Sequence, residues 1–95
     1  MAEININVNV VETAAINLNA YSNDINEQVK AMKIVMQIVE SAWSSKYTDD
    51  FLSCIQEVIN QMNLEAGNIH DIAVNLKSTA QDVRNVEKEI QINLL

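Results

Sequence analysis

The stretch ESAWSSKYTDDF, Glu40–Phe51, interrupts an otherwise regular hydrophobic pattern and decides how the chain folds. It holds the one Trp and the one Phe of a chain that has no Pro and a single Gly. Apolar residues recur at spacings of four and three on both sides of it, but the two patterns are out of phase, because Trp43 and Phe51 are eight residues apart instead of seven. The polar segment between them therefore predicts a turn.

The residues before the turn form one long heptad pattern. Nine of its ten positions are apolar, and Ser22 is the exception: Val11, Ala15, Leu18, Ser22, Ile25, Val29, Met32, Met36, Val39 and Trp43. Such persistence is typical of a long amphipathic helix. Asn9 followed by Glu12 resembles a helix N-cap with an acid three residues later, which predicts a first helix over residues 9–43.

A second pattern follows the turn and predicts a second helix over residues 46–91, with the turn at residues 44–48. Ten of its twelve positions are apolar: Phe51, Ile55, Val58, Met62, Glu65, Ile69, Ile72, Leu76, Thr79, Val83, Val86 and Ile90. Ser45 or Thr48 is the expected cap, with Ser45 preferred. Gly67 inside a helix costs about 1 kcal/mol relative to Ala, and a local kink or a close helix approach would explain its presence.

The expected fold class is all-α, an antiparallel two-helix hairpin over residues 9–95. In residues 1–8 apolar residues alternate with Asn, which is a local strand pattern. An isolated strand has no partner in such a fold, so we expect an extended or flexible N-terminal arm. At 95 residues the chain is one domain with a small core.

A second apolar stripe beside each heptad pattern predicts self-association or a partner. We expect these residues at that interface: Tyr21, Val35 and Ile38 of the first helix, and Leu52, Ile59, Ala66 and Ala73 of the second. Two antiparallel helices bury one stripe each against one another, so the second stripe needs another surface. The prediction is a dimer that forms a four-helix bundle, with identical or different subunits. The alternative is a monomer with a generous core.

The composition argues against several functions. The formal net charge of -7 disfavours binding to nucleic acid or to anionic membranes. Apolar runs are far shorter than the roughly 20 residues that span a bilayer. The N-terminus lacks the pattern of a Sec signal peptide, so we expect a protein made in the cytoplasm, with any export by another route.

No combination of residues predicts chemistry. His70 is the single histidine and has no metal-ligand or nucleophile spacing around it, so a solvated helix face is expected there. Cys54 is expected to pack as a small apolar group. We therefore predict no catalytic, cofactor-binding or metal-binding residues, no cofactor, and a protein that is not an enzyme.

The order A-W-x-x-x-Y-x-x-x-F in residues 42–51, between two heptad helices, resembles the WXG-type (early secretory antigenic target-like) family of type VII secretion. The resemblance implies that the turn residues Trp43, Ser44, Ser45, Tyr47 and Phe51 form a recognition site, with the secretion ATPase as a further partner. We expect the indole of Trp43 to fill a gap where the helices bend, at a value of about 3 kcal/mol if it is buried.

Two features depart from the family pattern. The family's Gly two residues after Trp is Ser45, so the bend must be shaped differently or be longer. The family's export motif, an aromatic residue or His followed four residues later by an acid after the second helix, is absent, since Val74 is four residues after His70.

Three hypotheses follow from these departures. The chain is a partner or targeting subunit that bundles with a second small hairpin or with the helical N-terminal region of a larger exported effector; this is our preferred prediction. The second hypothesis is that the chain is an independently exported homodimer. The third is that it is a cytosolic coiled-coil adaptor unrelated to secretion.

Overall fold

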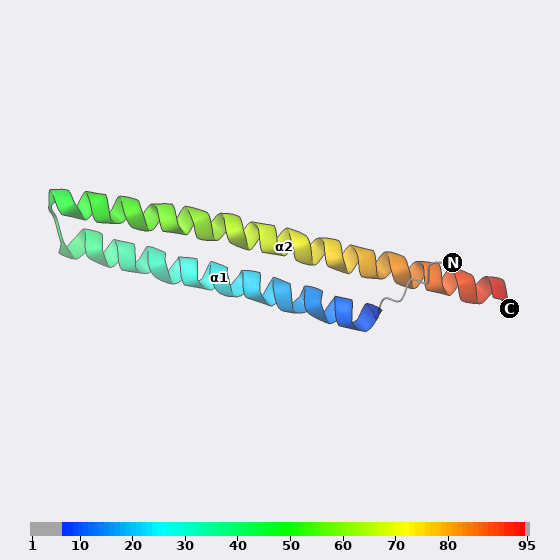
Figure 1. Ribbon diagram of the computed structural model, residues 1–95. Coiled ribbons are helices and arrows are strands. Elements are labelled where there is room, and N and C mark those ends of the chain that lie inside the picture. Colours follow the sequence, from blue (N-terminus) through cyan, green and yellow to red (C-terminus); the bar gives the residue numbers. More distant parts are fainter. Residues whose placement is uncertain (1–6, 95) are drawn as a thin grey trace.

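The computed structural model describes residues 7–94, and they form a helical hairpin (Figure 1). Helix α1 spans Val8–Ala42 and helix α2 spans Lys46–Leu94, with no strand anywhere in that range. Residues 43–45 reverse the chain, so the two helices run antiparallel. The predicted all-α hairpin is confirmed, and the arm predicted for residues 1–8 lies, apart from Asn7 and Val8, outside the described residues.

The N-cap of the first helix lies two residues before the expected cap, Asn9. Asn7 has extended backbone angles, and its side-chain oxygen accepts a hydrogen bond from the backbone N–H of Val10 at 3.3 Å. Its carbonyl also accepts from Val11 N–H at 3.2 Å. Asn7 is thus the N-cap, because a side-chain acceptor here satisfies an amide that the helix leaves free. The prediction of Asn9 as the cap is wrong.

The two helices meet along a seam, defined here as the buried and half-buried residues between them. On α1 the seam follows the predicted heptad pattern, with Ala15, Ser22, Ile25 and Val29 buried. On α2 the buried residues are Thr48, Ile59, Ala66, Ala73 and Ala80, flanked by half-buried Leu52, Ile55, Met62, Ile69, Leu76 and Val83. Half of the predicted α2 pattern is therefore wrong, because Phe51, Val58, Glu65 and Ile72 are exposed.

Small residues explain this register. The Ser22 hydroxyl donates a hydrogen bond to the backbone carbonyl of Ala66 at 2.8 Å, a contact that requires the two helix backbones to lie close together. Alanine at three consecutive heptad positions of α2 permits that approach. The observed register also leaves Glu65 in solvent, whereas the predicted one would have buried its charge, at a large desolvation cost.

Gly67 neither bends α2 nor marks a close approach. The helix runs through it without positive φ and without a kink (Figure 1), and a Cβ added there would meet nothing within 4 Å. Both explanations offered from the sequence are therefore wrong, and the residue simply lies on an open surface of the helix.

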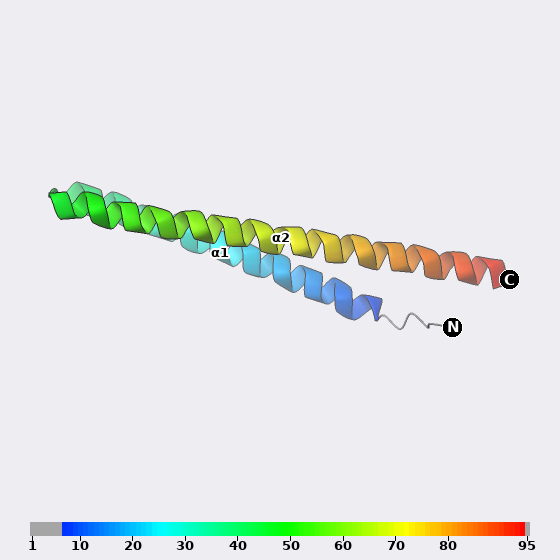
Figure 2. The same ribbon diagram turned by 45° about the horizontal axis from the view of Figure 1, so that its top comes forward.

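The hairpin is long and narrow, with extents of 75 × 21 × 14 Å. At 49 residues α2 is longer than α1 at 35, and its C-terminal end projects beyond the start of α1 (Figures 1 and 2). The second view shows the helices crossing at a shallow angle, as expected for heptad packing. A single layer of two helices leaves most of each helix surface in contact with solvent.

Candidate interaction surface

The turn presents its aromatic residues instead of burying them. Trp43 is the C-cap of α1 and has an extended backbone conformation. Its backbone N–H donates a hydrogen bond to the carbonyl of Val39 at 2.9 Å. Its side chain is 47% exposed and lies beside Phe51, with ring centroids 6.3 Å apart and planes tilted by 50°. Tyr47 is 73% exposed. The expectation that Trp43 is buried in the bend is therefore wrong. The indole contacts one neighbouring ring, that of Phe51, and its remaining surface faces solvent at the turn.

Ser45 and Thr48 start α2 together. Ser45 immediately precedes the helix, and its backbone N–H donates to Oγ1 of Thr48 at 3.1 Å, while Thr48 N–H donates to the carbonyl of Ser45 at 3.1 Å. The two hydroxyl oxygens are 3.2 Å apart. This is one half of a capping box: the Thr48 side chain takes the place of the usual Glu or Gln, whereas Thr48 N–H binds the carbonyl of Ser45 and not its hydroxyl. A Ser at this position closes the turn without the positive φ that a Gly would allow.

The expected interface residues separate into two groups. Tyr21, Val35 and Ile38 of α1 are exposed. On α2, Leu52 is half-buried while Ile59, Ala66 and Ala73 are buried. These four face α1 within the same hairpin, so the surface that a partner could contact has to be drawn with other residues of α2.

We define the apolar face as Tyr21, Val35 and Ile38 of α1 together with Phe51, Val58 and Ile72 of α2. All six side chains are between 41% and 59% exposed. Tyr21 and Val35 directly precede seam residues on α1, and Phe51, Val58 and Ile72 directly precede seam residues on α2. In an antiparallel pair such positions of both helices flank the seam on the same side. Cys54 is also exposed, so the expectation that it packs in the core is wrong.

The opposite side of the seam, which we call the polar flank, consists of Glu12, Asn19 and Lys33 of α1 with His70, Lys77 and Arg84 of α2. Each of these residues directly follows an apolar seam residue, and Glu12, Asn19 and Arg84 are themselves half-buried at the edge of the seam. Arg84 binds Glu12 with two hydrogen bonds of 2.8 and 3.0 Å, and it also donates to Asn9 at 2.8 Å. His70 Nδ1 lies 2.8 Å from the side-chain oxygen of Asn19. These contacts join the two helices and fix which residues share a flank.

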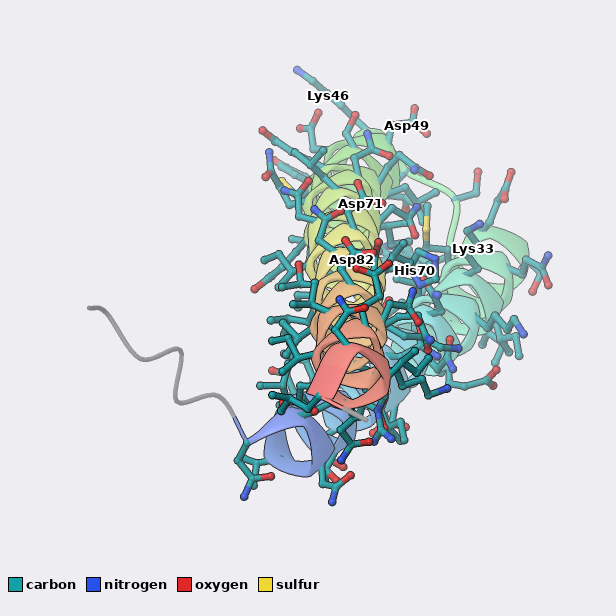
Figure 3. The ribbon with its side chains drawn as sticks, turned by 90° about the vertical axis from the view of Figure 1, so that its right-hand side faces the viewer. Lys33, Lys46, Asp49, His70, Asp71 and Asp82 are labelled. Atoms are coloured by element: carbon teal, nitrogen blue, oxygen red, sulfur yellow. The ribbon has the colours of Figure 1, made fainter. Side chains whose placement is uncertain are left out.

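The polar flank has little capacity for chemistry. In Figure 3, which views the hairpin end-on, His70 lies on the side of α2 that faces α1. The groove around it has a volume of about 390 Å³, is open to solvent, and is lined by Glu12, Asn19 and Lys77 among others. Within residues 7–94 no three His, Cys, Asp or Glu side chains are grouped so that they could hold a metal ion. Arg84, which sequence reasoning missed, joins helix ends that are 72 residues apart in the chain.

Comparison with known families identifies the chain. A sequence model described as "Proteins of 100 residues with WXG", the WXG100 family, matches residues 3–88 and therefore covers both helices and the turn. The chain belongs to the WXG100 family. Its members are small secreted helical proteins of type VII secretion, and they are known to dimerise. Neither the search of curated proteins nor the search of solved structures found a significant match.

Membership confirms the predicted resemblance, so Ser45 at the position of the family's Gly is a variation within the family. Here the residues at the family's Trp-x-Gly turn are Trp43, Ser44 and Ser45, and hydrogen bonds between Ser45 and Thr48 hold the turn. Neither helix, in the part of the chain that the structure describes, is long and apolar enough to cross a membrane.

Proposed function

We propose that this WXG100 protein is a non-enzymatic partner or targeting subunit for a larger exported effector of type VII secretion. The observation that carries the proposal is the apolar face, six exposed large side chains along one side of a hairpin in which residues 7–94 supply no third or fourth helix to cover them. Exposed apolar surface of this extent marks protein interfaces. Covering it with two further helices completes a four-helix bundle.

The occupant in this proposal is a second small hairpin or the helical N-terminal region of the effector. Residues 52–95 contain no copy of the family's export motif, since no aromatic residue occurs among them and Val74 stands four residues after His70. A subunit of this kind relies on its complex to complete the export signal. We propose that it is made in the cytoplasm and leaves with its partner by a route other than Sec.

The exposed end of the hairpin is the proposed contact for the secretion ATPase. Trp43, Tyr47 and Phe51 present aromatic surface there, Ser44 lies between them in the turn, and Ser45 is held by its hydrogen bond to Thr48. Phe51 belongs both to the apolar face and to this end of the hairpin, where it lies beside Trp43, so a partner on the apolar face would lie next to an ATPase bound at the turn.

Deletion of the gene in its host tests the proposal. We expect at least one larger protein with a helical N-terminal region to disappear from the culture medium, as measured by quantitative mass spectrometry. Wild-type protein should restore export, and a Val35→Asp/Ile38→Asp variant should not. Ile16→Asp is the matched control, because Ile16 is 68% exposed but lies outside the apolar face.

Two other results would replace the proposal. An unchanged set of exported proteins, with the chain itself recovered from the medium as a homodimer, would establish the independently exported substrate. An unchanged set of exported proteins with the chain retained in the cells would support an adaptor role without a cargo.

A further inference from the structure

The charges of the hairpin are divided between its two sides. All six Lys and Arg side chains lie either on the polar flank or on the helix surface next to it: Lys30, Lys33, Lys46, Lys77, Arg84 and Lys88. None lies on or beside the apolar face. This follows from the register, because Lys30, Lys33, Lys77 and Arg84 each directly follow a seam residue. Lys46 and Lys88 each lie three heptads from Gly67, which directly follows the seam residue Ala66, so they share that strip of α2.

The apolar face carries only negative charge. Glu65 lies in the same row as Val58 and Ile72, seven residues from each, and Asp24 lies one helical turn after Tyr21. Asp82 and Glu89 continue the outer edge of the face along α2. All four are exposed, and within residues 7–94 the ion pairs are Lys30 with Glu27 and Arg84 with Glu12, so none of the four carboxylates is neutralised in the hairpin.

We infer that the apolar face selects a partner that is not a second copy of this chain, namely a helical protein whose matching apolar surface is edged by Lys or Arg. The inference rests on the proposed function and specifies the chemistry of the partner. Two copies joined through this face would bring eight carboxylates and no cation to one interface. Like charges at an interface disfavour the wrong partner, whereas complementary charges fix the right one and speed its association.

A charge-reversed copy of the chain serves as the surrogate partner. The variant Asp24→Lys/Glu65→Lys/Asp82→Lys/Glu89→Lys keeps the apolar side chains and changes the net charge from -7 to +1, since each reversal adds two units. The matched control reverses four exposed acids away from the face, Glu27→Lys/Asp50→Lys/Glu57→Lys/Asp71→Lys, and has the same net charge. Circular dichroism first establishes that both variants are as helical as the wild type.

Sedimentation equilibrium then measures the dissociation constants. In low salt, we expect wild type and the reversed copy to form a 1:1 complex at least about tenfold tighter than the wild-type homodimer and than the mixture of wild type with the control. High salt should reduce the difference between these dissociation constants, because salt screens the exposed charges. Ile72→Ser in the wild-type chain should weaken the complex, and Ile16→Ser should not.

Three results would overturn the inference. One is a wild-type homodimer as tight as the mixed pair, and another is a control variant that binds as well as the reversed copy. The third is a reversed copy that stays unbound although it is folded. Each leaves the gene-deletion result untouched, so failure of charge selection is distinguishable from failure of the proposed function.

Discussion

The two flanks of the hairpin are built by the same pair of helices but differ in how far the chain satisfies them. On the polar flank Arg84 binds Glu12 and His70 contacts Asn19, so the helices complete these interactions between themselves. On the apolar face Val35, Val58 and Ile72 remain about half exposed. The difference teaches that one hairpin can satisfy polar groups across its seam but cannot cover the apolar side chains on the other side.

The largest expected effect tests which row of α2 faces α1. Ile59→Ala should lower the free energy of unfolding by about 3 kcal/mol, because Ile59 is fully buried and its loss leaves a cavity. The adjacent Val58→Ala should cost less than about 1 kcal/mol, because Val58 is 47% exposed. Urea denaturation at one low protein concentration measures both. A larger loss for Val58→Ala would mean that the register predicted from the sequence is the true one.

The sequence allowed the hairpin to be predicted but not the register of α2. Its heptad period, the polar turn and the lack of Pro are local signals, and the α1 seam followed from them. On α2 two interleaved patterns were available, and the one chosen contained Glu65 and Thr79. The row from Leu52 to Val83 that uses Ala66 and Ala73 has no polar member, which was the signal that could have decided between them.

The exposure of the turn could not be predicted for a different reason. A Trp between two helices fits either a packed bend or a presented surface, and the choice depends on whether a third element covers it. Partner surfaces in general have this property, because the sequence of one chain does not contain the residues that cover them. The sequence indicated that an apolar face exists. It did not identify the α2 residues of that face, because those depend on which row of α2 packs against α1.

Trp43 gives the next largest effect and reports on the presented end of the hairpin. Trp43→Ala should lower the free energy of unfolding by about 1 kcal/mol, well below the value for a buried indole, because about half of the side chain is already in solvent. Chemical denaturation followed by circular dichroism measures it. A loss near 3 kcal/mol would show that the indole is packed in solution, and the proposed ATPase contact would lose its exposed aromatic surface.

Gly67 tests the open surface of α2 that belongs to neither the seam nor the apolar face. Gly67→Ala should raise the free energy of unfolding by about 0.5–1 kcal/mol, because Ala loses less conformational entropy in a helix and its Cβ meets no neighbour within 4 Å. Thermal unfolding of the two proteins compares them. Lower stability of the Ala variant would indicate that another surface approaches the backbone at this position, which would extend the interaction surface beyond the apolar face.

The smallest expected effect tests whether the polar flank is complete within one chain. Arg84→Gln should lower the free energy of unfolding by about 0.5 kcal/mol, since the ion pair with Glu12 is partly exposed, with side chains 38% and 34% accessible. The loss should shrink in high salt, because the interaction is screened. Lys88→Gln is the matched control, since Lys88 is exposed and forms no ion pair within residues 7–94. Equal losses for the two variants would show that net charge and not the contact is measured. A loss of several kcal/mol for Arg84→Gln alone would mean that packing of the start of α1 against α2 depends on this pair. The polar flank would then stabilise the hairpin as the seam does.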